Sequence, residues 1–502
     1  MPQRIKLRLA FLSRQRPPES ISRRVAMNVA IVTFVGVSWP FAGSLPAQAQ
    51  ADAAMSKDML LVGNHPLQAR SAYQPHPHRY PDGRYILFVG HHAGQVLNPQ
   101  TGKVEQNGTS VVDVTDPTKP VYLQHIPGVE GAQMAQACNG KDLPHGDPDK
   151  VYLLRPNGDL EHQVWDVSNP AAPALLSTPQ TGLEGTHRNW WQCNTGIAYI
   201  VSDLRPLGWS TSRGLQVFDL GDPTKPVLIR NFALTGMQPG GQDVFDGTNG
   251  VHEATVSEDG SKVYLAYGTG ADGVIQILDR EKLLKGDPAV ADPYAPTPAN
   301  LVYPELGRLD MPAHWGAHTV YSLGRIPIAY DRGFAIGASR EILVVASESR
   351  ANECQEAHHG VSIVDFTDGK HPYPIATYRV RDASIDFCAR GGRFGAHNVS
   401  PTYFKPFYPG FIVVAYFNAG ARVVDVRDPF HPQEIAFYIP AMTANTTPRC
   451  VVVDGEERCK TAIQTNLAEI DDRGLIYLSD RANTGMHIVT LSGAAKATVT
   501  GQ

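Results

Sequence analysis

Short apolar runs separated by turn residues recur along the whole chain. RYILFVG (84–90), KVYLAYG (262–268) and FIVVAYFN (411–418) are rich in β-branched and aromatic residues, and Gly, Pro, Asn or Asp lie near their ends. Short runs with such boundaries predict β-strands rather than helices. The pattern therefore predicts an all-β protein.

One motif marks the end of a strand in each repeat. A β-branched run ends in Asp, and Pro follows four and seven residues later, as in VVDVTDPTKP around Asp113. Asp caps local backbone N–H groups, and Pro fixes φ and cannot join the next ladder, so the strand stops there. Full or partial copies occur at Asp113, Asp166, Asp219, Asp279, Asp365 and Asp425, with a degenerate seventh copy near Thr490.

The motif belongs to a repeat of four strands. One strand precedes each copy, one follows it, and a fourth segment leads into the next unit, with a period of 53 to 86 residues. This pattern is typical of the blades of a β-propeller, and seven units predict seven blades. Residues 59–64 (MLLVGN) are expected to supply the missing strand of the last unit and so remove an exposed edge. A pair of β-sandwiches is the alternative, although sandwiches do not need seven similar units.

The recurring V-V/I-V-D strand resembles the LVIVD-repeat family of bacterial β-propeller proteins over about residues 58–491. That resemblance implies the fold and leaves the activity open, because propellers host many functions. The segment HEATVSEDGSKVYLAYG (252–268) is faintly similar to selenium-binding and methanethiol-oxidase-type propellers. This second resemblance implies a copper-dependent thiol oxidase, and one segment is too little to carry that activity over.

Four G-x-H tripeptides lie at one place in four successive units, in the segment expected to line the propeller axis. Imidazoles that converge from adjacent blades form a metal-binding geometry, and neutral imidazole is a ligand of Zn, Cu, Fe and Ni. We therefore predict one transition-metal ion, Cu, Fe or Zn, with no carboxylate ligand, a set that favours Lewis-acid or O₂ chemistry. Duplication of a purely structural histidine is the alternative. The predicted ligands are His187, His252, His318 and His397.

Counting residues extends this ring to the other units. Gln133 occupies the matching place in the second unit, and counting back twelve residues from Tyr477 and Ile86 gives Thr465 and Gln74. The glycine two residues before each histidine is expected to leave open space in the channel. His91-His92, after the strand RYILFVG, is predicted to be a solvated turn.

Three neighbours of this ring are the candidate catalytic residues. Arg188 follows His187, and Arg393 lies in the predicted rim loop CARGGRFG. Glu253 follows His252, so strand alternation points it away from the channel. There it either orients a ligand from behind or pairs between blades.

Composition and the N-terminus bear on partners and location. Apolar residues make up 42% of the 502 residues and charged residues 19%, with a formal charge of −5, so nucleic-acid binding is not expected. The N-terminus predicts a signal peptide over residues 1–49, because basic residues precede an apolar run that ends near Ala47-Gln48-Ala49. The export route, Sec or twin-arginine, stays open. A membrane anchor is the alternative. We predict a periplasmic or secreted protein without stable membrane insertion after cleavage. The propeller would span 58–491, followed by a C-terminal tail, 492–502.

The six cysteines are expected to form disulfides, because their number is even and the chain is predicted to be exported. Cys450 and Cys459 bracket the hairpin predicted over Val451–Arg458, and Cys138 and Cys193 occupy similar places in successive repeats. Cys354 and Cys388 are then the remaining pair. Six cysteines allow fifteen connectivities, so this pairing is a hypothesis.

The function predicted from the sequence is that of a metal-dependent, oxidative enzyme that acts on a small organic substrate. The alternative is a non-catalytic propeller that binds envelope or extracellular proteins. The sequence leaves the metal, the substrate and the oligomeric state open.

Overall fold

A computed structural model describes residues 53–242, 250–328, 338–381, 384–400 and 403–501. The description below concerns the unit Pro46–Gln502, within these ranges. The predicted signal peptide, residues 1–49, lies outside the described residues. None of the helices in the described ranges combines the length and the apolar character needed to cross a membrane.

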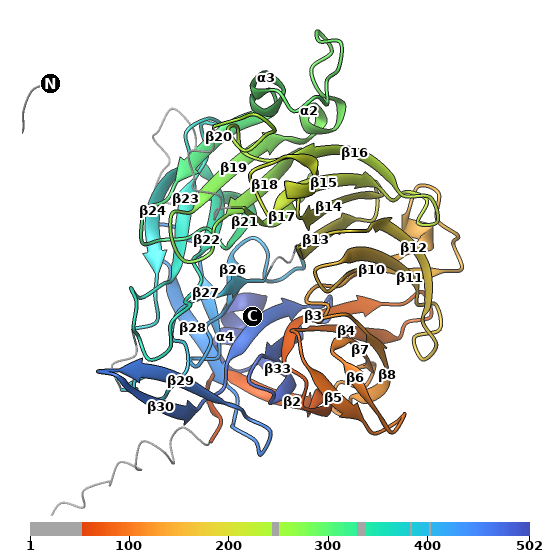
Figure 1. The fold of residues 1–502 in the computed structure, drawn as a ribbon. Helices are drawn as coiled ribbons and strands as arrows, with labels where there is room; N and C mark the ends of the chain where they lie inside the picture. Colours follow the sequence, from red (N-terminus) through yellow and green to blue (C-terminus); the bar gives the residue numbers. More distant parts are fainter. Residues whose placement is uncertain (1–52, 243–249, 329–337, 382–383, 401–402, 502) are drawn as a thin grey trace, which may run out of the picture. The chain divides into compact units, whose positions relative to one another are not determined.

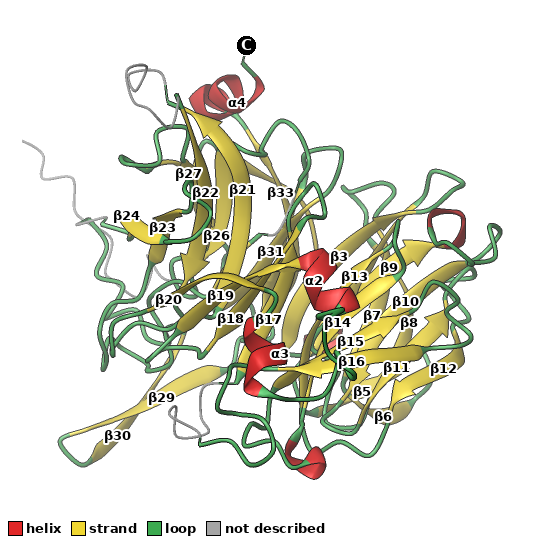
Figure 2. Ribbon diagram, turned by 90° about the horizontal axis from the view of Figure 1, so that it is seen from above, coloured by secondary structure: helices red, strands yellow, loops and turns green. Residues whose placement is uncertain are grey.

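The described residues form seven antiparallel sheets of four or five strands, arranged around a common axis (Figure 1). Each sheet is one blade. The strands run from innermost to outermost in chain order, except that the outermost strands of the last two blades come from the N-terminus. The seven-bladed β-propeller predicted from the repeat is confirmed. Strands are the main regular element of the described chain, and the helices are short (Figure 2).

The first four blades follow one another along the chain. Blade 1 contains β3 (Ala72–Arg79), β4 (Tyr85–His91), β7 (Gly108–Asp113) and β8 (Val121–Pro127). Blade 2 contains β9 (Gln136–Asn139), β10 (Val151–Asn157), β11 (Glu161–Asp166) and β12 (Ala174–Gln180). Blade 3 contains β13 (Thr186–Gln192), β14 (Ile197–Ser202), β15 (Gly214–Asp219) and β16 (Val227–Phe232). Blade 4 contains β17 (Val251–Val256), β18 (Lys262–Tyr267), β19 (Val274–Asp279) and β20 (Glu305–Asp310).

Of the last three blades, blades 6 and 7 each include a strand from the N-terminus. Blade 5 contains β21 (Thr319–Pro327), β22 (Ser339–Ala346), β23 (Val361–Asp365) and β24 (Tyr373–Tyr378). Blade 6 contains β25 (Asn398–Val399), β26 (Phe411–Ala415), β27 (Ala421–Asp425), β28 (Gln433–Ile439) and β1 (Met55–Lys57). Blade 7 contains β31 (Thr465–Ile470), β32 (Ile476–Asp480), β33 (Gly485–Leu491) and β2 (Met59–His65).

The remaining elements are hairpins and short helices outside the blade sheets. Two further hairpins are β5 (Gln95–Asn98) with β6 (Lys103–Gln106), and β29 (Pro448–Val453) with β30 (Glu456–Thr461). The α-helices in the described ranges are α2 (Arg280–Lys285), α3 (Pro298–Val302) and α4 (Gly493–Thr500). Short 3₁₀ turns occur at η1 (Leu67–Ala69), η2 (Gly140–Asp142) and η3 (Arg205–Leu207).

The Asp that recurs in the repeat caps the turn after its strand, as expected from the sequence. Asp113 accepts a hydrogen bond from the backbone N–H of Thr115 at 2.9 Å, and Asp425 accepts one from Arg427 at 3.0 Å. Each bond closes a turn just after the third strand of a blade. In blade 4 the same position, Asp279, instead caps α2.

The two ends of the propeller are joined by β2. Its Met59 lies opposite Leu491 of β33 in an antiparallel ladder, as the sequence predicts. Met59 is buried in a cluster that also contains Ala495 and Val499 of α4, so part of the predicted C-terminal tail packs on the closing blade. The ladder leaves the last blade without an open β33 edge.

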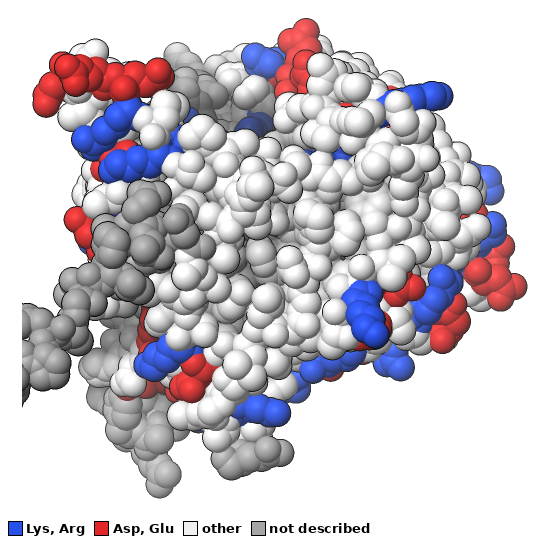
Figure 3. All heavy atoms as spheres, turned by 90° about the horizontal axis from the view of Figure 1, so that it is seen from below, with Lys and Arg blue, Asp and Glu red and all other residues white. Residues whose placement is uncertain are grey.

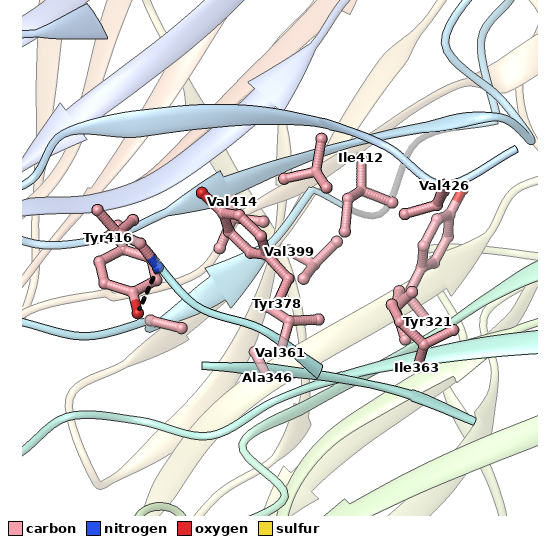
Figure 4. Packing of buried hydrophobic residues seen from close by; sticks show 14 of the residues in the cluster. Tyr321, Ala346, Val361, Ile363, Tyr378, Val399, Ile412, Val414, Tyr416 and Val426 are labelled. Carbon is pink, nitrogen blue, oxygen red and sulfur yellow. Dashed lines mark hydrogen bonds between the residues drawn. The ribbon is translucent and has the colours of Figure 1, made fainter. Parts of the chain in front are cut away.

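The core lies between the blades. Tyr321, Val361 and Ile363 of blade 5 pack against Val414 and Tyr416 of blade 6 (Figure 4). Because neighbouring sheets pack on one another in this way, their innermost strands are left to line the axis. The structure therefore supports the propeller over a pair of sandwiches.

All three predicted disulfides are confirmed. Cys138 and Cys193 link blades 2 and 3, and Cys354 bonds to Cys388. Cys450 and Cys459 pair across the hairpin β29–β30, which projects from the ring in Figure 1. Stable disulfides form in oxidising compartments, so these bonds favour an extracytoplasmic location.

The closing strand should carry a large share of the stability. A chain that lacks residues 1–65 loses the β2–β33 ladder and the buried Met59, whereas a chain that lacks residues 1–57 keeps both. We expect the shorter protein to lose more than about 3 kcal/mol of unfolding free energy relative to the longer one. Urea denaturation measures the difference, and equal midpoints would contradict this role of β2.

Candidate metal centre

Four histidines from adjacent blades meet at the axis of the propeller. His187 lies in β13 and His252 in β17, whereas His318 and His397 immediately precede β21 and β25. The ring centroids of successive pairs, in chain order, are 4.2, 3.8 and 4.4 Å apart. The Nε2 atoms of His187 and His252 are 2.6 Å apart. The structure thus brings together the four imidazoles that the sequence proposed as ligands.

Backbone carbonyls fix the orientation of two of these rings. His252 Nδ1 lies 2.8 Å from the carbonyl oxygen of His318, and His397 Nδ1 lies 2.5 Å from that of Asn466. Because a carbonyl oxygen only accepts, Nδ1 carries the proton in both rings and Nε2 keeps its lone pair. This is the usual arrangement of a metal-binding histidine, whose second nitrogen donates to a neighbouring group.

His318 presents a buried nitrogen that is without a partner. Its Nδ1 lies 3.0 Å from Thr319 Oγ1, while its Nε2 finds no hydrogen bond among the described residues. A buried polar atom in this state costs free energy unless a ligand or water satisfies it. Nε2 of His318 is therefore free to bind a ligand, and its place between His252 and His397 makes it a candidate metal ligand.

A carboxylate also reaches the ring, which the sequence analysis did not expect. Glu348, just after β22, places one oxygen 4.0 Å from His318 Nε2 and the other 3.9 Å from His397 Nε2. Ligand atoms of His318, Glu348 and His397 all lie within 4.8 Å of one another. Glu348 therefore joins the four histidines as a candidate ligand, while the predicted donor set itself stays a prediction.

The imidazoles are held in the neutral form. Burial lowers the pKa of all four histidines well below the usual value, and nearby positive side chains add to the effect. Neutral imidazole is the form that binds metal ions, so no proton has to be displaced from these rings near neutral pH.

Behind the ring lies a buried ion pair between Arg188 and Glu253. Arg188 Nη1 bonds to Glu253 Oε1, and only 1% and 5% of the two side chains are exposed. Burial raises the pKa of Glu253, and the positive charge of Arg188 opposes that rise. The pair joins β13 to β17, so Glu253 takes the inter-blade role that was one of the two alternatives.

Arg188 connects this pair to a tyrosine that the sequence did not indicate. Its Nε and Nη2 donate to Tyr73 Oη at 3.3 and 3.2 Å. The same phenol oxygen lies 3.4 Å from His187 Nε2, and the ring stands edge-on to His187 and His397. Arg188 thus holds Tyr73 in contact with the histidine ring.

A cavity of about 570 Å³ opens over the histidines. Arg393 lies in its wall, donates to Glu348 Oε1 at 2.7 Å and also bonds to the carbonyl oxygen of Ser349 at 3.2 Å. Arg393 therefore reaches the ring through Glu348. The polar and charged lining comprises Tyr73, His92, Gln133, His187, Ser212, Arg213, His252, Thr269, His318, Glu348, Arg350, Arg393, His397 and Arg481.

Counting residues misplaced two members of the ring. The structure puts Tyr73 rather than Gln74 at the cavity, while Gln74 bonds to the backbone N–H of Ala135 at 2.7 Å. In blade 7 the residue that lies at the register shift of the inner strand is Asn466 rather than Thr465. Both inner strands have a register shift at this point, as blades 3 and 4 have at His187 and His252. The turns after the inner strands differ in length, so a fixed count fails.

Two further expectations about the channel are wrong. The glycines do not open space, because a Cβ at Gly316 would lie 1.8 Å from the carbonyl oxygen of Thr269, and one at Gly250 would lie 2.6 Å from Arg213 Cβ. They allow the loop of the preceding blade to approach closely. His91-His92 is not a solvated turn either, since His91 is buried and His92 lines the cavity.

Antiparallel pairing explains the cavity residues that the sequence analysis missed. The second strand of each blade ends where the inner strand begins, so residues just after β4, β18, β22 and β32 lie beside the histidines. His92, Thr269, Glu348 and Arg481 all follow such strands. The segment EILVVASE (341–348) was recognised as a strand, and its final Glu was the available signal.

Comparisons with known proteins add little to this picture. No model of a protein family matches the chain, and no curated protein matches it. Among solved structures, Sqt1 from Chaetomium thermophilum is 11% identical with a TM-score of 0.47, over 86% of this chain and 99% of that one. The β-propeller domain of Cps50 (Swd1) from Myceliophteria thermophila is 9% identical with a TM-score of 0.43, over 87% and 99%. Such scores carry no argument, and the fold assignment rests on the strand pairing.

Removing one partner of the Arg188–Glu253 pair should destabilise the fold more than removing both. Replacing Arg188 with Met leaves a buried carboxylate without its counterion, and we expect a loss of about 3–5 kcal/mol in unfolding free energy. The double variant Arg188→Met/Glu253→Met should recover most of this loss, because no charge is then buried alone. Chemical denaturation measures both effects.

A matched control is the pair Arg427–Asp425, which ends β27 with 56% of the arginine side chain exposed. Arg427→Met should cost less than about 1 kcal/mol. An equal loss in Arg188→Met and Arg427→Met would contradict the buried-pair account.

Proposed function

We propose that this chain is an exported, metal-dependent enzyme of oxidative type that acts on a small organic substrate. His187, His252, His318 and His397 would hold one Cu, Fe or Zn ion at the propeller axis, with Glu348 beside it. The protein would be periplasmic or secreted and a member of the LVIVD-repeat propellers. The alternative remains a propeller that binds other proteins and uses its histidines only structurally.

One observation carries the proposal: imidazoles from four blades meet in a buried space with their free nitrogens turned inward. In His252 and His397 the Nδ1–H is bonded to a carbonyl, and in His318 the Nε2 is an orphan. Nitrogen ligands of one tetrahedral ion stand about 3.3 Å apart, so small rotations of these rings would admit an ion.

The donor set also fits the proposed ions. Neutral imidazoles with one carboxylate suit Zn, Cu and Fe, whereas Mg and Ca prefer sets made only of oxygen. When bound, such an ion supplies Lewis-acid activation or, for Cu and Fe, electron transfer to and from small molecules.

The surrounding residues have roles that follow from their contacts. Arg393 holds Glu348 toward His318 and His397. Arg188 donates two hydrogen bonds to Tyr73, which leaves the phenol proton available to donate to a group in the cavity. Glu253 keeps Arg188 in place, so Glu253 and Arg188 act as positioning residues and Tyr73 faces the substrate space.

Metal content of the purified mature chain tests the proposal. We expect about one Cu, Fe or Zn per chain by elemental analysis after exposure to each metal, and loss of that metal in the His252→Ala/His318→Ala variant. His162→Ala is the matched control, because His162 is a fully buried histidine of blade 2 that bonds to the carbonyl oxygen of Val201. The control should keep its metal.

Circular dichroism and thermal unfolding establish that each variant is folded before its metal content is compared. If neither the parent chain nor the variants retain a metal, the enzyme proposal is wrong and the scaffold alternative gains support. Metal retained equally by the parent and the double variant would place the ion elsewhere.

A further inference from the structure

The cavity over the histidines concentrates positive charge. Its wall contains four arginines, Arg213, Arg350, Arg393 and Arg481, and a single carboxylate, Glu348. Arg393 Nη1 lies 2.7 Å from Glu348 Oε1, and Arg481 Nη1 lies 4.0 Å from the same atom. Two guanidinium groups thus share one carboxylate, and the wall keeps a net positive charge.

Arg213 is a partly buried cation of this wall without a partner among the described residues. Among the described residues, its guanidinium has neither a hydrogen-bond acceptor nor an ion-pair partner, although the side chain is only partly exposed. The carboxylates of Glu348 and Asp159 act on it from beyond ion-pair distance. It lies beside His187, whose pKa its charge lowers further after burial has done so. A partly buried guanidinium in this state has its donors free for a ligand.

This charge is local to the cavity. The whole chain has a formal charge of −5, and on the face drawn in Figure 3 acidic and basic side chains are interspersed without a large area of one sign. A concave site of one sign raises the local concentration of ligands of the opposite sign. The cavity therefore attracts anions in a chain whose net charge is negative.

We propose that the substrate of this site is a small organic anion, whose oxyanion group binds Arg213 and is drawn in past Arg350 at the exposed rim. Guanidinium groups recognise carboxylate and phosphate through paired N–H donors, and this chemistry is common to both groups. The inference deepens the proposed function, because the anion would be held next to the histidine ring. Cationic substrates are disfavoured by the same charges.

Isothermal titration calorimetry tests the inference with succinate and inorganic phosphate as probes and neutral succinamide as the comparison. We expect at least one of the two anions to bind and succinamide not to bind. Arg213→Gln should weaken anion binding by about tenfold to a hundredfold, because one charge-assisted contact is lost. Arg427→Gln, at an exposed ion pair far along the sequence, should leave binding unchanged.

The two probes also separate a carboxylate-binding site from a phosphate-binding site. If Arg213→Gln does not fold by circular dichroism, Arg350→Gln provides the comparison, with a smaller expected loss because Arg350 is exposed. Raised salt should weaken binding of the anion to the parent chain. Absence of binding by both anions, or equal binding by the parent and the arginine variants, overturns the inference.

Measurements on metal-free and metal-loaded protein keep this test apart from the test of the metal centre. Anion binding that depends on Arg213 in the metal-free chain supports the anion site even if no metal binds. Binding that requires the metal and ignores Arg213 shows the metal to be the anion receptor, and it overturns the arginine site while the proposed metal centre stands.

Discussion

Antiparallel pairing between the first two strands of each blade is the constraint on which the site depends. The pairing places the start of an inner strand beside the end of its neighbour, so histidines from the inner strands meet Glu348 and Arg481 at one mouth of the channel. Packing between blades then holds the inner strands around the axis. Residues far apart in sequence form one centre because every blade repeats the same hairpin geometry.

Much of the fold could be predicted because its causes are local and repeated. The Asp-Pro turn, the β-branched strand and the four-strand period each follow from short-range chemistry, and residues 59–64 were recognisable as the strand missing from the last unit. The four histidines were equally visible, since G-x-H recurs at one place in the repeat. The cysteine pairs followed from a hairpin and from similar places in successive repeats.

What could not be predicted depends on exact register and on contacts between blades. Turns of unequal length after the inner strands shift the count by one residue, so Tyr73 and Asn466 replace Gln74 and Thr465. Glu348 carries no motif and enters the site only through the pairing of β22 with β21. The glycines before the histidines serve close approach between blades, which no single repeat reveals.

Burial gives the centre its chemical character. It keeps the four imidazoles neutral, and it makes the Arg188–Glu253 pair and its bonds to Tyr73 a fixed support rather than a surface contact. The arginines of the wall add positive charge where the imidazoles add none. The result is a ring of neutral donors with an anion-attracting entrance.

The most direct test of the central claim is anomalous diffraction from crystals of the mature chain grown with Cu or Zn. The account predicts one strong peak on the propeller axis, within coordination distance of the Nε2 atoms of His187, His252, His318 and His397. A peak bound only at the molecular surface, or no peak at the axis under saturating metal, would contradict it.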